Sequence, residues 1–68
     1  MKHLLSNTVQ ESRKKHQLTQ AELADIVSVT RQTIISIEKG NYVPSVALAL
    51  KIAKALNTEV EELFILTN

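Results

Sequence analysis

Hydrogen-bonding side chains are concentrated between Arg31 and Lys39, in a segment whose isoleucines recur at helical spacing. With Ile34 and Ile37 facing inward, the opposite side of such a helix presents long polar groups and one apolar group. The major groove of duplex DNA accepts one α-helix and displays hydrogen-bond donors, acceptors and thymine methyl groups. We therefore predict that this side reads bases, through Arg31, Gln32, Thr33, Ile35 and Ser36.

Each of these residue types suits a base edge. Arg31 can bond O6 and N7 of guanine, Gln32 can bond N6 and N7 of adenine, and Ile35 can contact a thymine methyl group. Thr33 and Ser36 can serve base edges or phosphate. The competing interpretations are an ordinary solvated helix face and, for Ile35, packing on a neighbouring residue.

A second set of polar residues flanks this helix at positions suited to phosphate. Gln20 lies at a predicted helix N-terminus, where free backbone N–H groups and the helix dipole favour an anion. Other polar residues stand just before the reading helix or follow it. Such contacts position a protein on DNA without specifying sequence. The predicted phosphate set is Gln20, Thr30, Lys39, Asn41 and Tyr42.

Capping signals divide the chain into five short helices, expected over about 7–16, 20–27, 31–39, 46–56 and 58–64. Capping boxes are predicted at Asn7 or Thr8, at Thr19 and at Thr58, each with Glu or Gln three residues later. In the second helix the inward residues are expected to be Ala21, Leu23, Ala24 and Val27. In the fourth they are expected to be Val46, Ala49, Leu50, Ala53 and Leu56, widened by Leu48 and Ile52.

The helices over 20–27 and 31–39 are separated by only three residues, 28–30. A turn this short makes two helices cross steeply, and a steep crossing needs a small side chain at the closest approach. Ala24 supplies that side chain. The spacing therefore predicts a helix-turn-helix over residues 20–39.

Length and composition favour a single domain over residues 1–68 with a thin hydrophobic core. The absence of cysteine excludes disulfides and Cys/His zinc sites, and two histidines are too few for a structural metal, so no metal or cofactor is expected. A dimer is the remaining way to stabilise so small a core. No apolar stretch spans a membrane, and the expected compartment is the cytoplasm.

Charge is distributed unevenly along the chain. The net charge is +1, but residues 1–54 hold all eight Lys and Arg against four acids, and residues 55–68 hold three acids and no base. A basic region of this kind suits phosphate. An enzyme is not expected, because there is no cysteine nucleophile, no glycine-rich phosphate loop and no histidine with an evident acid partner.

The motifs Leu18–Ala24, Thr30–Ile34, Ile37–Gly40, Pro44–Ser45 and Ala49–Leu56 closely resemble the phage lambda repressor/Cro-type helix-turn-helix family. The resemblance covers about residues 7–64 and is strongest to very short, free-standing bacterial members without an effector domain. It implies an all-α, compact five-helix lambda-repressor-like DNA-binding domain that represses transcription as a homodimer on a palindromic operator. It also implies an ion pair between Arg13 and Glu38 beneath the reading helix.

Four positions depart from the family pattern. Ser28 replaces the glycine usual in the turn, and Gln17 and Asn57 stand where glycine commonly ends a helix. A non-glycine residue at left-handed angles costs about 1–2 kcal/mol. Ser12 stands where a core leucine is common, so the first helix should be weakly anchored.

The two chain ends are too apolar for free tails. They either dock on their own domain or meet, as two short paired strands, beside a dimer interface formed by residues 58–68. The predicted interface residues are Leu63, Phe64, Ile65 and Leu66, and the partnering segment is 1–5. The alternative function is a protein-binding module with the same fold, such as the antitoxin of a toxin pair.

Overall fold

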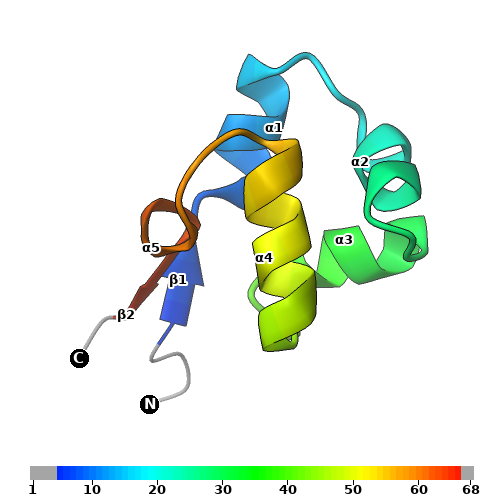
Figure 1. The fold of residues 1–68 in the computed structure, drawn as a ribbon. Helices are drawn as coiled ribbons and strands as arrows, with labels where there is room; N and C mark the ends of the chain where they lie inside the picture. The colour runs from blue at the N-terminus through cyan, green and yellow to red at the C-terminus, as the bar shows by residue number, and fades with distance from the viewer. Residues whose placement is uncertain (1–4, 67–68) are drawn as a thin grey trace.

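Five helices and one antiparallel pair of short strands make up residues 5–66, the part of the chain that the computed structural model describes (Figure 1). The expected all-α five-helix domain with a small terminal strand pairing is therefore confirmed. None of the helices in this part is long and apolar enough to cross a membrane. The elements are β1 (Leu5–Asn7), α1 (Val9–Lys15), α2 (Gln20–Ile26), α3 (Arg31–Glu38), α4 (Val46–Ala55), α5 (Val60–Leu63) and β2 (Phe64–Leu66).

The two strands bring the ends of the described chain together. Leu5 pairs with Leu66 and Asn7 pairs with Phe64 in an antiparallel register. The rest of the predicted N-terminal partner, residues 1–4, lies outside the described residues. The small sheet sits beside α5 in Figure 1 and packs against it.

Three helices begin at hydroxyl N-caps. Thr19 and Glu22 close a capping box, with bonds of 3.0 Å to the Glu22 N–H and 2.8 Å from the Thr19 N–H. Thr30 Oγ1 accepts from the N–H of Thr33, and Ser45 caps α4 in the same way. Because each cap satisfies a backbone N–H that the helix leaves free, these residues fix where α2, α3 and α4 start.

The capping boxes predicted at Asn7 or Thr8 and at Thr58 are wrong. Thr8 Oγ1 donates to the backbone carbonyl of Glu62 at 2.9 Å, and Thr58 Oγ1 donates to the Glu62 carboxylate at 2.8 Å. The first N–H of α1 is instead capped by Asn7 Oδ1 at 3.1 Å. Contacts between distant parts of the chain have replaced local capping at both ends.

Helices α1 to α4 each end in a left-handed residue, and only one of these four residues is glycine. Gln17, Ser28, Gly40 and Asn57 have φ angles of 59°, 63°, 80° and 53°. The residue after Ser28 donates its N–H to the carbonyl of Ala24 at 2.9 Å, and the other three ends repeat this pattern. The left-handed angles expected at Gln17, Ser28 and Asn57 are thus confirmed.

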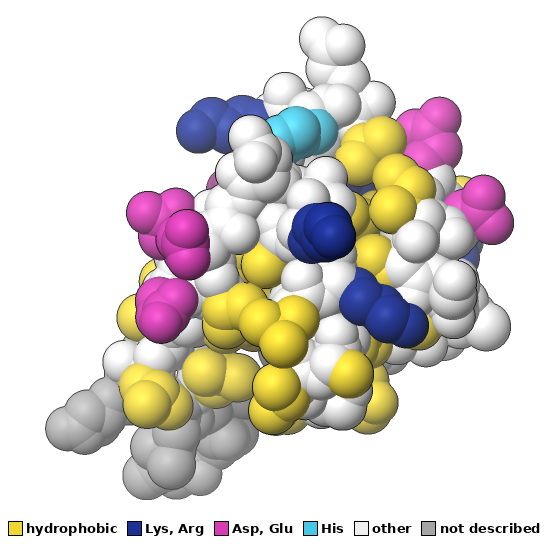
Figure 2. Space-filling view, viewed as in Figure 1, with side chains coloured by type: hydrophobic (Ala, Val, Ile, Leu, Met, Phe, Trp, Pro, Cys, Tyr) yellow, Lys and Arg dark blue, Asp and Glu magenta, His cyan; other side chains and the backbone are white. Residues whose placement is uncertain are grey.

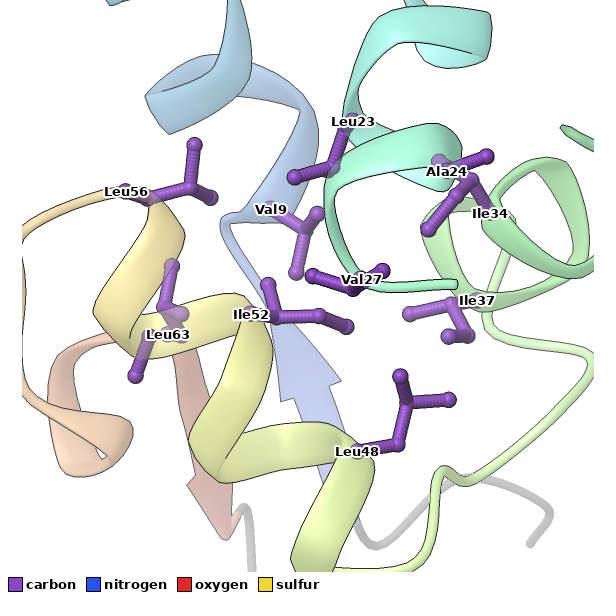
Figure 3. Close-up of a cluster of buried hydrophobic side chains, with 11 residues drawn as sticks. Val9, Leu23, Ala24, Val27, Ile34, Ile37, Leu48, Ile52, Leu56 and Leu63 are labelled. Atoms are coloured by element: carbon purple, nitrogen blue, oxygen red, sulfur yellow. The ribbon is translucent and has the colours of Figure 1, made fainter. Parts of the chain in front are cut away.

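The hydrophobic core lies where α1, α2, α3, α4 and α5 converge (Figure 3). Figure 3 shows Ala24 on the side of α2 that faces α3, as the short turn requires. Ala24 is 3% exposed and Ile34 is fully buried. The buried residues of this cluster are Val9, Leu23, Ala24, Val27, Ile34, Ile37, Leu48, Ile52, Ala53, Leu56 and Leu63.

Two predicted core faces need correction. Ala21 is exposed, because it lies on the side of α2 that no other described element covers. On α4 the buried side is formed by Leu48, Ile52, Ala53 and Leu56, whereas Val46 is 77% exposed and Leu50 is 56% exposed. The apolar pattern of α4 was wider than the surface that its neighbours cover.

Replacing Ser28 by glycine should stabilise the protein. The left-handed angle costs a residue with a Cβ about 1–2 kcal/mol, and the greater freedom of glycine in the unfolded chain offsets part of this. We expect a net gain of about 1 kcal/mol, equivalent to roughly 4–8 °C in Tm for a domain of this size. Ser28→Ala is the matched control and should give no gain, since alanine keeps the Cβ. Equal Tm values for Ser28→Gly and the unmodified protein in thermal unfolding would contradict the assignment of strain.

Candidate nucleic-acid interface

Helix α3 has one buried side and one open side. Ile34 and Ile37 are fully or almost fully buried, and they anchor α3 against α2 and the rest of the core. Among the predicted base-reading residues, Arg31 and Gln32 are exposed, while Thr33, Ile35 and Ser36 are partly buried. The side of α3 opposite the isoleucines is therefore accessible, with the long polar side chains as its most prominent members.

The open side of α3 continues into the loop that follows it. An open depression of about 290 Å³ is lined by members of both predicted sets. Tyr42, at 48% exposure, forms one wall. The structure thus brings part of the base set and part of the phosphate set to one surface, formed by Thr30, Gln32, Thr33, Ser36, Asn41 and Tyr42.

Thr30 and Thr33 also hold the start of α3. Their hydroxyl groups lie 3.1 Å apart, and Thr30 Oγ1 accepts the backbone N–H of Thr33 as well. Both side chains are therefore engaged within the protein at the N-terminus of α3. Gln32, between them, is exposed and faces outward.

The side chain of Gln20 points into the protein. Its Nε2 donates to Glu38 Oε1 at 3.1 Å, so this amide nitrogen is already engaged. The phosphate contact predicted for Gln20 would therefore have to use its backbone N–H at the start of α2. A depression of about 400 Å³ lies there, lined on either side by Lys14 of α1 and Arg31 of α3.

A buried ion pair lies directly beneath α3. Arg13 Nε donates to Glu38 Oε2 at 2.7 Å and Arg13 Nη2 donates to Glu38 Oε1 at 3.2 Å. The two side chains are only 8% and 4% exposed. Arg13 Nη1 donates to the carbonyl of Leu18 at 2.8 Å, and Gln20 supplies the remaining bond to the carboxylate. Among the described residues no buried side-chain polar atom lacks a hydrogen-bond partner.

This network joins α1, the turn after it, the start of α2 and the last residue of α3. We define it as the Arg13–Glu38 network, comprising Arg13, Leu18, Gln20 and Glu38. A bidentate guanidinium–carboxylate pair has a fixed planar geometry, so it restrains the orientation of α3 as well as its position. Sequence reasoning missed the role of Gln20, because no local pattern tells an inward amide at a helix start from an outward one.

Asn7 is a second residue that positions α3 and that the sequence did not identify. Its Nδ2 donates to the carbonyl of Ile37 at 2.9 Å, while its Oδ1 caps α1. The last carbonyls of any helix lack intrahelical partners, so a donor from elsewhere was to be expected near Ile37. The donor comes from a residue thirty positions earlier, which no local rule could select.

The four tail residues predicted to form a dimer interface are divided by the structure. Leu63 is 1% exposed and belongs to the core of its own chain, so it is unavailable to a second copy. Phe64 is partly buried and packs against the same core. Ile65 and Leu66 are 41% and 79% exposed. Only the last two can contribute substantially to an interface, because β2 turns its other side chains inward.

The fold and the open side of α3 define a helix-turn-helix protein, and the comparison with known families agrees. The helix-turn-helix family profile of the lambda repressor/Cro type matches residues 9–63, and the chain belongs to that family. The family's class is that of DNA-binding transcriptional regulators.

Individual relatives are similar over most of their length. A protein of Methanothermobacter thermautotrophicus, named an uncharacterized HTH-type transcriptional regulator, is 58% identical over 59 residues, which cover 85% of this chain and 86% of that protein. The regulator YgzD of Bacillus subtilis, also named uncharacterized, is 48% identical, covering 88% and 91%. Among solved structures, the restriction-modification controller protein C.AhdI from Aeromonas hydrophila is 31% identical with a TM-score of 0.74, covering 79% and 82%.

Breaking the Arg13–Glu38 network from one side should be costly. Arg13→Met leaves the Glu38 carboxylate buried without its cation, and such single deletions cost about 3–5 kcal/mol. The double variant Arg13→Met with Glu38→Met removes both charges and should recover most of that loss. Lys14→Met is the matched control on the exposed side of α1 and should change stability little. These values are to be measured by urea unfolding, and equal losses for Arg13→Met and Lys14→Met would contradict the role assigned to the pair.

Proposed function

We propose that this protein is a sequence-specific, double-stranded DNA-binding transcriptional regulator that reads its site with α3 in the major groove. The observation that carries the proposal is the combination of an open, hydrogen-bonding side of α3 with an inner side held rigidly by the Arg13–Glu38 network. A helix that reads bases must present its side chains at a fixed angle. The network supplies that rigidity while leaving Arg31 and Gln32 free.

The residues divide into two roles. Arg31, Gln32 and Ser36, with Ile35 against a thymine methyl group, supply the discrimination between sequences, and each good bidentate contact contributes about 1–3 kcal/mol. Lys39, Asn41 and Tyr42, at the end of α3 and in the loop after it, hold the sugar-phosphate backbone. Most of the affinity then comes from phosphate contacts and falls steeply as salt rises.

The regulator acts as a homodimer on a palindromic operator, and it represses transcription. Two copies related by a two-fold axis place their recognition helices about 34 Å apart, so that both enter the same side of the duplex one turn from each other. The short chain supports this proposal, since a core this small gains stability from association. Repression follows when the bound dimer occupies DNA that the transcription machinery needs.

A selection of duplexes from a random pool, at a stated salt concentration, tests the reading of bases by α3. The selected site should be palindromic, and Gln32→Ala should weaken binding to it by about 5–150-fold, the equivalent of 1–3 kcal/mol, with relaxed preference at one base pair of each half-site. Gln10→Ala, which removes an exposed glutamine from α1, is the matched control and should bind like the unmodified protein. Unchanged affinity and preference for Gln32→Ala would overturn the assignment.

A second candidate function is a module that binds another protein, as in an antitoxin of a toxin pair. The exposed apolar side chains of α4 and β2 favour it, because large apolar groups in contact with water often mark protein interfaces. Co-purification with the product of a neighbouring gene, together with a duplex selection that enriches nothing, would favour this candidate over the first.

A further inference from the structure

Exposed apolar side chains gather on one side of the molecule, away from the reading surface. In Figure 2 they extend from β2 across the lower half of α4. Their exposed fractions are large for apolar residues, from 41% to 79%. We define this surface as the α4–β2 face, formed by Val43, Val46, Leu50, Ile65 and Leu66.

Charges of opposite sign flank the α4–β2 face. Lys51 and Lys54 are exposed on α4, and Glu59 and Glu61 are exposed at the start of α5. Figure 2 shows basic side chains over α4 and acidic side chains over α5, with apolar side chains between them. The face is therefore an apolar band with a positive border on one side and a negative border on the other.

We infer that the α4–β2 face binds the same face of a second copy of this chain, related by a two-fold axis. In a contact of this kind each residue of one copy meets its counterpart set on the other, so a surface must complement itself. Rotation by 180° brings the apolar band against the apolar band and sets the lysine border against the glutamate border. The inference rests on the homodimer of the proposed function and names the surface that forms it.

The size of the face suits a second copy of this chain. A stable interface takes about 800 Å² from each partner. The chain exposes 4675 Å² in all, so a stable dimer requires roughly a sixth of its surface. The apolar band alone is a modest fraction of that area, and the charged borders have to belong to the interface for it to be stable. An apolar core with a polar rim is the usual arrangement.

The position of the face leaves the recognition helix accessible. In Figure 1, α5 and the two strands lie on one side of α4, and α3 lies on the other. A second copy docked on the α4–β2 face therefore does not cover Gln32 or the loop after α3. The same molecule can associate through one surface and read DNA with another.

Sedimentation equilibrium of the full chain tests the face directly. The unmodified protein should be a dimer, and Leu50→Lys should raise the dimer dissociation constant by at least about 100-fold, because a lysine would be buried in an apolar contact. The matched control is Ile26→Lys on α2, since Ile26 is also an apolar helix residue with 56% exposure and lies outside the face. Ile26→Lys should leave the dimer intact. Equal behaviour of the two variants, or a monomeric unmodified protein at all concentrations, overturns the inference.

A charge exchange tests the two-fold arrangement separately. The variant Lys51→Glu with Lys54→Glu has two negative borders, and the variant Glu59→Lys with Glu61→Lys has two positive borders. Each should dimerise poorly alone, and an equimolar mixture should form a heterodimer. The absence of a heterodimer would contradict the pairing of the lysine border with the glutamate border.

Failure of this inference can be told apart from failure of the proposed function. If Leu50→Lys remains dimeric while Gln32→Ala loses its preferred site, the surface is wrong and the DNA-binding function stands. If Leu50→Lys is monomeric but the unmodified protein selects no duplex, the interface stands and the proposed function fails. A monomer that is captured by a product of a neighbouring gene through Leu50 would replace the second copy with a different protein.

Discussion

A carboxylate buried at 4% exposure is stable only if hydrogen bonds replace its lost hydration, and Glu38 obtains them from Arg13 and Gln20. These donors come from α1 and from the start of α2, whereas Glu38 is the last residue of α3. The three elements must therefore meet in one arrangement for the carboxylate to be satisfied. Buried pairs of this kind add little net stability compared with apolar packing, and their effect is to exclude other arrangements. In this protein the arrangement that survives directs Arg31 and Gln32 outward.

The core and the strained helix ends explain why association matters for so short a chain. Gln17, Ser28 and Asn57 all occupy left-handed angles that suit glycine better, and each reduces the stability of the isolated domain. The α4–β2 face remains in contact with water unless a partner covers it. A dimer would recover stability at the surface where the monomer leaves Val46 and Leu50 exposed.

Much of this architecture could be predicted from local sequence signals. The Thr19–Glu22 capping box, the three-residue turn and the left-handed position of Ser28 depend on neighbouring residues alone, and the structure contains all three. The inward direction of Ile34 and Ile37 followed from helical periodicity in the same way. The accessible side of α3 followed from that direction, so the surface proposed to read bases could be identified early.

Features that depend on distant parts of the chain could not be predicted. Asn7 reaches the end of α3, and Gln20 turns toward Glu38, because partners far away in the sequence are placed nearby by the fold. Periodicity showed that α4 is apolar on more than one side but not which side its neighbours cover. The central claim is that α3 meets DNA, and amide NMR spectra of the labelled protein titrated with its selected duplex test it most directly. We predict the largest shift changes at 31–39 and 41–42, whereas changes confined to α4 and β2 would contradict the account.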